Sequence, residues 1–284
     1  MTNGTILYPV AKFHKFLHAA PIFRPIKRGA RRMGLEYVHT SSDGEKSLML
    51  RLFWELDISD QDLLTALVAM CVSSTDSTVI SSTPEQEGNK ILRGKLLLDG
   101  EVANMPAIAV HTTTYALLIE LGRTTGAENY RWLDKALDRL SAVTIKYIDR
   151  SVTQVFNLLS YCVGTEGGIS ICINPYSATA ILGSNGGYVL IHRQERSQLK
   201  TQAARALHAK LCGLVDTKSS RTIRVKTLAD KIYGDSRGKG TTTTITKAAL
   251  EINMLLDWSC VVTGRGAHAT IKITRSATSQ PCSA

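Results

Sequence analysis

The sequence lacks any long hydrophobic run, and its cysteines are few and scattered. No stretch approaches the roughly 18 consecutive apolar residues that a membrane-spanning helix needs, and we expect no secretory signal peptide. The six cysteines never lie two to four residues apart, which is the spacing that zinc fingers use. We therefore expect a cytoplasmic protein, since thiols stay reduced there, with no membrane segment and no structural zinc.

Signatures of catalysis are also missing. The seven histidines include no His-x-His pair, so the metal site of rolling-circle nicking enzymes has no candidate. No Gly-x-Ser-x-Gly elbow and no clustered pair of acids occurs. Gly234, Gly238, Lys239 and Gly240 approximate a phosphate-binding loop, but the spacing is one residue short and a glycine replaces the magnesium-binding hydroxyl residue. We expect no catalytic residue, no metal and no cofactor.

Acidic residues are scarce at the two ends of the chain. The formal net charge is +10 over 284 residues. Residues 1–32 hold seven basic residues and no acid, and residues 221–275 hold ten basic residues against four acids. The remaining residues are mildly acidic in sum. A basic protein with its charge concentrated in this way favours a polyanionic partner such as nucleic acid.

The last third of the chain has the element order of a winged helix-turn-helix, in which three helices precede a two-stranded hairpin. Apolar residues at helical or alternating spacing indicate each element. Gly264-Arg265-Gly266 supplies the tight turn of the hairpin, which is the wing. We expect helices at 198–211, 227–233 and 242–256, and strands at 221–225, 260–263 and 269–274.

A weaker copy of this order lies upstream. Leu63, Leu64 and Leu67 mark a long helix that begins after Ser59. A loop over 73–90 and a short strand at 95–98 follow, and further elements are expected as helices at 113–121 and 128–141, a hairpin over 143–162 and a strand at 169–173. A hairpin with its turn at Asp43-Gly44 precedes the whole module.

These patterns predict an α+β protein with two tandem winged-helix domains and a basic N-terminal arm. The arm is preferred to a targeting helix because Pro21 and Pro25 interrupt it. Gly183 to Gly187 is expected to be a flexible junction. The predicted division is residues 1–58 for the arm and hairpin, 59–187 for the first winged-helix domain, 188–275 for the second and main DNA-reading domain, and 276–284 for a tail.

Candidate DNA contacts follow from this arrangement, because a recognition helix sets polar side chains against base edges while loops and wings hold phosphates. For each group the plainer alternative is a solvated polar surface, and it is strongest in the first domain, where Asp134 and Asp138 share the helix. Asn253 lies near the open face of the last helix. The predicted DNA-binding residues are Thr242, Thr243, Thr246 and Lys247 on that helix, Arg237 and Lys239 before it, Arg265, His268 and Lys272 on the wing, Arg221 and Arg224 on the first strand, Tyr130, Arg131, Lys135 and Arg139 in the first domain, and Lys27, Arg28, Arg31 and Arg32 on the arm.

Several short segments, in order along almost the whole chain, resemble the RepC-type replication initiators of broad-host-range IncQ-like plasmids, which bind repeated origin sequences called iterons. The segments are Ile22-Phe23-Arg24 through Lys27-Arg28-Gly29, Asp62 to Met70, Asn174-Pro175 with the glycine-rich run after it, Ala204 to His208 through Leu211-Cys212-Gly213 and Asp216, and Trp258 through Arg275. The chain departs from this family at the start of the last recognition helix, which is strongly basic in related proteins and is Thr241 to Thr244 here.

The resemblance implies a non-enzymatic, bacterial plasmid replication initiator that binds double-stranded origin DNA at its iterons. It also implies origin opening by copies bound side by side, possible self-association, and assistance in loading a plasmid-encoded hexameric helicase that works with a separate primase. Three alternatives stay open. A winged-helix transcriptional repressor would bind an inverted repeat, a DNA-nicking initiator enzyme would cut supercoiled origin DNA, and a scaffold that binds only proteins would show no salt-dependent DNA binding.

Overall fold

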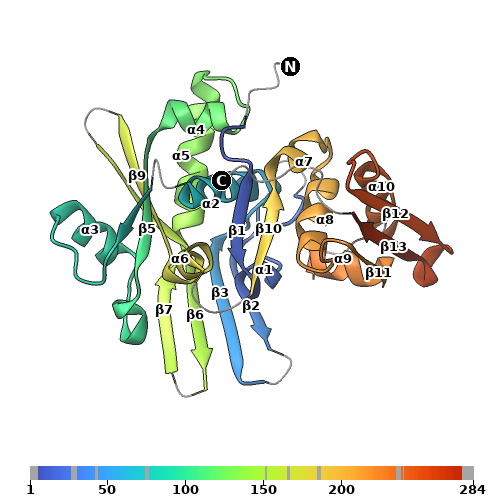
Figure 1. Ribbon diagram of the computed structural model, residues 1–284, viewed down its shortest axis with the longest axis horizontal. Helices are drawn as coiled ribbons and strands as arrows, with labels where there is room; N and C mark the ends of the chain where they lie inside the picture. Colours follow the sequence, from blue (N-terminus) through green and yellow to red (C-terminus); the bar gives the residue numbers. More distant parts are fainter. Residues whose placement is uncertain are drawn as a thin grey trace.

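The chain folds into a larger N-terminal unit, a short connecting helix and a smaller C-terminal unit, with a mixed α/β architecture throughout (Figure 1). The computed structural model describes residues 6–26, 31–41, 44–73, 77–150, 152–164, 167–183, 187–234, 238 and 240–276. We call residues 6–192 the N-terminal unit, helix α7 (Arg193–Gln198) the connector, and residues 199–276 the C-terminal unit.

The N-terminal unit is built around helix α2, which is buried on nearly every side. Asp57 caps this helix by accepting the Asp60 backbone N–H, and the Asp60 carboxylate in turn accepts the Asp57 backbone N–H, which forms a capping box. The elements of the unit are β1 (Val10–His14), α1 (Lys15–Ala19), β2 (Met33–Thr40), β3 (Lys46–Trp54), α2 (Ile58–Val72), β4 (Ser77–Ile80), α3 (Glu87–Lys95), η1 (Gly100–Asn104), β5 (Ala107–Thr113), α4 (Thr114–Glu120), α5 (Ala127–Ser141), β6 (Val143–Asp149), β7 (Val152–Asn157), β8 (Leu159–Val163), β9 (Gly168–Ile173), α6 (Pro175–Leu182) and β10 (Tyr188–His192).

Three antiparallel sheets surround α2. One has the strand order β2-β3-β6-β7, the second β4-β5-β9-β8, and the third is the pair β1-β10. The predicted hairpin before the first module corresponds to β2 and β3. It joins the hairpin β6–β7 in a single sheet through the pairing of β3 with β6. Leu50, Ile145 and Phe156 are aligned across this sheet and are fully buried beneath it.

The prediction of a free basic arm is wrong for residues 10–26, because these residues belong to the core. Strand β1 pairs with β10 in the register Val10↔His192. Ile22 is buried, and the buried Arg24 faces Glu55 at 3.7 Å. The strand that completes this pair lies almost 180 residues downstream in the sequence, so local composition gives no sign of it. A basic, proline-containing segment of this kind reads as an arm when its partner is unknown.

The C-terminal unit holds three packed helices and a small sheet, as predicted. Its elements are α8 (Gln202–Cys212), β11 (Ser219–Arg224), α9 (Val225–Tyr233), α10 (Thr241–Ile252), β12 (Trp258–Thr263), η3 (Gly266–His268) and β13 (Thr270–Arg275). The strand order is β11-β13-β12, all antiparallel. Alternation sets the faces of β13, so that Ile271 and Ile273 are buried against the helices while Lys272 is exposed.

Two further predictions about the N-terminal half need correction. The sequence predicts a loop over 73–90 and a strand at 95–98, but the described residues of this stretch include strand β4 and helix α3. The boundary at residue 188 is also misplaced, because β10 pairs with β1 inside the N-terminal unit. Gly183 and Gly187 thus both lie within that unit, residues 184–186 lie outside the described residues, and the passage between the units is helix α7.

Candidate nucleic-acid interface

Helix α10 presents a polar, uncharged first half to solvent. It begins after Gly240, whose φ of +87° favours glycine. Its buried face holds Ile245, Ala249 and Ile252, so Thr243 and Lys247 lie on the exposed face. The hydroxyl of Thr246 donates to the Thr242 carbonyl at 3.1 Å. Its lone pairs therefore remain as acceptors toward an incoming donor.

A hollow of about 210 Å³ lies between the first turns of α10 and the turn that joins β12 to β13. Three predicted contact residues on α10 line it together with the predicted wing residue, so the fold brings them to one place. Gly264 and Gly266, both at positive φ, let the turn fold back toward the helix. The lining residues are Val225, Thr242, Thr243, Thr246, Val262, Gly264, Arg265, Gly266 and Ala269.

The electrostatics around this hollow suit an anion. The only acid on α10, Glu251, is directed at the start of α8, where it accepts the backbone N–H and the hydroxyl of Thr201 at 3.0 and 2.7 Å, and the N–H of Lys200. Burial opposes the charge, but these donors lower the pKa of Glu251 below its ordinary value. The N-terminal end of α10, with its partial positive charge, and Arg265 therefore face solvent without a neighbouring carboxylate on α10.

The other predicted DNA contacts, on the wing and on strand β11, lie on different surfaces of the C-terminal unit. His268 is exposed in η3, in the same turn as Arg265. Lys272 and Arg224 lie on the face of the sheet that is turned away from α10, because the alternate residues of β13 are buried. Arg221 lies on the other face and donates to the Leu214 carbonyl at 3.2 Å. These three cations do not meet at the hollow.

Asn253 is not free to read a base. Its side-chain nitrogen donates to the Cys260 carbonyl at 3.1 Å, and its oxygen accepts the Cys260 backbone N–H at 2.5 Å. The residue ties the end of α10 to β12. Thr244, which sequence reasoning did not select, is exposed on α10 three residues before Lys247. The i, i+3 spacing of these two residues is the signal that would have found it.

In the N-terminal unit, α5 holds the four predicted residues, and one of them must be corrected. Arg139 is largely buried and forms an ion pair with the fully buried Asp60, with 2.6 Å between Nη2 and Oδ1. It supports the fold and does not face solvent. Tyr130 is half-buried and packs against the core. Arg131 and Lys135 are exposed, but the acidic side chains at 128, 134 and 138 are exposed with them.

Two of the four predicted arm residues are engaged with acids of the core. Arg31 contacts Asp57, and its Nη1 lies 3.0 Å from Asp60 Oδ2. Arg32 pairs with Glu55 at 2.9 Å and keeps a side chain that is 44% exposed. Arg31 is thus mainly structural, while Arg32 retains an open face. Four further predicted contacts lie outside the described residues: Lys27, Arg28, Arg237 and Lys239.

Within the described part of the chain, no group of three His, Cys, Asp or Glu side chains is arranged to hold a metal ion. None of the described helices is both long and apolar enough to cross a membrane. The constellation that the fold does assemble is the polar helix, the wing turn and the hollow between them.

Comparisons with known proteins agree with one another. A family model described as replication protein C (RepC) matches residues 12–264. The crystal structure of Pi initiator protein in complex with iteron DNA superposes with a TM-score of 0.53 at 13% identity, covering 96% of this chain and 99% of that one. A crystal structure of domains 2 and 3 of RctB gives a TM-score of 0.54 at 9% identity, covering 92% and 98%. These likenesses establish a shared fold. A comparison with curated protein sequences gives no significant match.

Proposed function

The chain belongs to the replication protein C (RepC) family, and we propose that it initiates plasmid replication by binding repeated origin sequences. The observation that carries this proposal is the hollow between α10 and the wing turn, where Thr242, Thr243, Thr246 and Arg265 converge at a helix N-terminus. Such a surface suits a duplex, since threonine and arginine side chains contact phosphates and base edges.

Both units act as winged-helix modules in this proposal. In the C-terminal unit α10 is the recognition helix and β12–β13 the wing. In the N-terminal unit the order α2, β5, α4, α5, β6–β7, with β4, α3 and η1 inserted after α2, parallels the order α8, β11, α9, α10, β12–β13. The C-terminal unit supplies most of the base reading, because the exposed face of α10 has no acid whereas α5 mixes both charges.

The division of roles follows from charge. Arg265 and Lys247, with Lys239 and Arg237 before the helix, grip the backbone or guanine, and the threonines contact thymine methyl groups or phosphates. The structural relative bound to iteron DNA supports origin repeats as the target. Copies bound side by side strain and open the origin. The protein then assists the loading of a plasmid-encoded hexameric helicase that works with a separate primase, and it acts by binding, without catalysis.

A salt titration of DNA affinity tests the proposal. The purified full chain is titrated against a labelled duplex carrying one origin repeat and against a scrambled duplex of the same composition. If about six phosphates are neutralised, both affinities fall about a thousandfold between 50 and 200 mM salt. The repeat should stay at least about a thousandfold tighter than the scrambled duplex. Equal affinities, or a flat salt response, would contradict the proposal.

A further inference from the structure

The connector α7 presents charged side chains to both units. Arg193 and Arg196 are three residues apart and so share one side of the helix. Glu195 points elsewhere, since each residue advances about 100° around the axis. Both arginines are almost fully buried. A short helix with buried charges on opposite sides has the character of a structural bridge, not of a flexible linker.

On one side, the arginines bind the N-terminal unit. Arg193 contacts the Glu120 carboxylate of α4 and donates to the carbonyls of Tyr8 and Glu120 at 2.8 and 2.9 Å. Arg196 donates to Asp62 Oδ1 at 2.5 Å and to Gln61 Oε1 at 2.9 Å, both on α2. It also reaches the C-terminal unit, since its Nη1 donates to the Arg205 carbonyl of α8 at 2.7 Å.

On the other side, Glu195 binds the C-terminal unit. Its Oε2 lies 2.8 Å from Nε2 of the buried His208 on α8 and accepts the indole N–H of Trp258 on β12 at 3.0 Å. Asp62 adds a direct link, because its second oxygen accepts from Arg205 Nη1 of α8 at 2.8 Å. Asp62 therefore holds the connector and the C-terminal unit at the same time.

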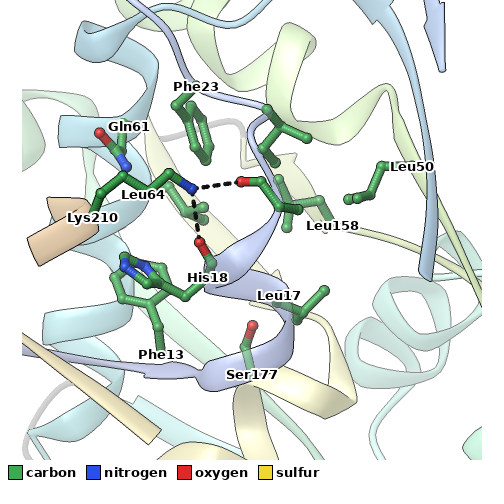
Figure 2. Close-up of a pocket in the computed structure, with 12 residues that line it drawn as sticks. Phe13, Leu17, His18, Phe23, Leu50, Gln61, Leu64, Leu158, Ser177 and Lys210 are labelled. Carbon is green, nitrogen blue, oxygen red and sulfur yellow. Dashed lines mark hydrogen bonds between the residues drawn. The ribbon is translucent and has the colours of Figure 1, made fainter. Parts of the chain in front are cut away.

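A second bridge joins the units beside the connector. Figure 2 shows Lys210 of α8 extended toward the first segment of the chain, where its ammonium group donates to the carbonyls of His18, Ala19 and Ala20 at 3.1, 3.3 and 3.0 Å. The ring of His18 returns a bond to the Ala209 carbonyl at 2.8 Å. The adjoining cavity of about 30 Å³ has room for on the order of one or two water molecules, so it is not a ligand pocket.

These contacts resist any change in the relative orientation of the units. Turning one unit against the other would leave buried charges without partners, which is strongly unfavourable. Helices α5 and α10 consequently keep a constant separation and direction. We propose that α7 and Asp62 hold the two DNA-binding units as one rigid body, so that the protein measures the spacing between two sequence elements within a single origin repeat. This inference rests on the proposed function.

The experiment varies the spacing on the DNA. One duplex carries a single footprinted repeat, and others carry one, two, five or ten extra base pairs between its two contacted elements. One inserted pair rotates the second element by about a tenth of a turn and moves it about 3.4 Å along the axis. The wild-type chain should lose at least about tenfold in affinity with one inserted pair, and ten pairs should not restore binding, because a rigid protein cannot extend by a whole turn.

Two isosteric variants test the assignment to the connector. Asp62→Asn removes the charge that Arg196 and Arg205 share, and Glu195→Gln removes the charge between His208 and Trp258. In the double variant, one inserted base pair should lower the logarithm of the DNA affinity by less than half as much as it does in the wild-type chain. Its affinity for a duplex carrying only the C-terminal unit's element should match wild type, which shows that this unit is still folded. Glu36→Gln, which removes an exposed ion pair with Arg51, is the matched control and should keep the full penalty.

The outcomes separate the two proposals. If the wild-type chain binds the uninterrupted repeat specifically but tolerates one inserted pair within about twofold, the rigid-spacing inference is wrong and the proposed function stands. If the double variant keeps the full penalty, the connector and Asp62 are not what fixes the spacing. If no duplex is bound specifically, the proposed function fails and this inference fails with it.

Discussion

At the scale of single residues, the structure separates the cations that hold the fold together from those that remain open to a ligand. Arg139 is paired with a fully buried carboxylate, whereas Arg131 on the same helix is exposed and bonds only the carbonyl one turn earlier. The two residues have the same chemistry and opposite surroundings. Only the exposed one is available to a phosphate.

This difference gives a stability prediction. Arg139→Met should lower the free energy of unfolding by about 3 kcal/mol, because Asp60 loses one of its buried partners. Arg131→Met should change it by less than about 0.5 kcal/mol, as expected for a surface site. Chemical denaturation of both variants measures the two values. Similar losses in both would show that the Arg139–Asp60 pair is not structurally important.

Lys247 is the best candidate for contact with a base. It is exposed on α10 one turn beyond Thr243. Lys247→Ala should weaken binding to the origin repeat by about 1 to 3 kcal/mol and should weaken binding to scrambled DNA much less. Lys90→Ala on α3, an exposed lysine of the N-terminal unit, is the control. Equal losses on both duplexes would reassign Lys247 to the phosphate backbone.

At the scale of elements, α10 begins with four threonines and no basic residue. Thr243→Arg should add about one phosphate contact and steepen the salt dependence of non-specific binding by about 0.9 in the log–log slope. Specificity for the repeat should fall, because one more contact is made equally to every sequence. Binding isotherms at several salt concentrations measure the slope. An unchanged slope would mean that position 243 does not face the DNA.

The contact between α7 and α8 gives a pH prediction. Burial opposes a charge on His208, but the Cys212 sulfur and the Glu195 carboxylate together raise its pKa to about 9 from the ordinary 6.5. The folded chain therefore keeps a proton that the unfolded chain releases. The resulting stabilisation is fully present below about pH 6.5 and is lost as the pH rises through about 9.

Denaturation of wild type and His208→Gln across this range is the corresponding measurement. Between pH 6.5 and 9.5 the wild-type free energy of unfolding should fall by on the order of 2 kcal/mol more than that of the variant. Parallel curves for the two proteins would contradict a charged His208 in the fold. The same loss should loosen the connector, since the ion pair between Glu195 and His208 would weaken to a hydrogen bond from a neutral ring.

The elements of the C-terminal unit could be predicted from sequence because its signals are local. The buried face of α10, the glycine turn of the wing and the alternation of β13 are each contained within about a dozen residues. The grouping of the predicted contact residues on α10 with Arg265 at the wing tip follows directly from these local signals. The interpretation of Asn253 as a residue on the open face is wrong, because its hydrogen-bond partner Cys260 lies on another element, seven residues away.

The N-terminal unit was harder to predict because its structure depends on distant pairs. Strand β1 is completed by β10, and Arg139 by Asp60. The connector interactions likewise join residues 62, 195, 205 and 258. No periodicity in the sequence reflects such pairs. The sequence therefore predicts an arm where the fold has a core strand, and a DNA contact where it has a structural arginine.

At the scale of the whole molecule, the charge distribution and the fold support one account. The chain has a net charge of +10. Many of its basic side chains form ion pairs within the N-terminal unit. Among the described residues, Lys247 of α10 and Arg265 of the wing turn face solvent. A basic protein of this kind approaches DNA through long-range attraction and reads it through few side chains.

The most direct test of this account is a nuclease footprint of the purified full chain on the origin of the replicon that encodes it, at about 0.15 M salt. The account predicts protection of direct repeats of one sequence, each covered by one molecule, with Lys247→Ala weakening protection at every repeat. Uniform protection, no protection, or protection of a single inverted repeat would contradict it.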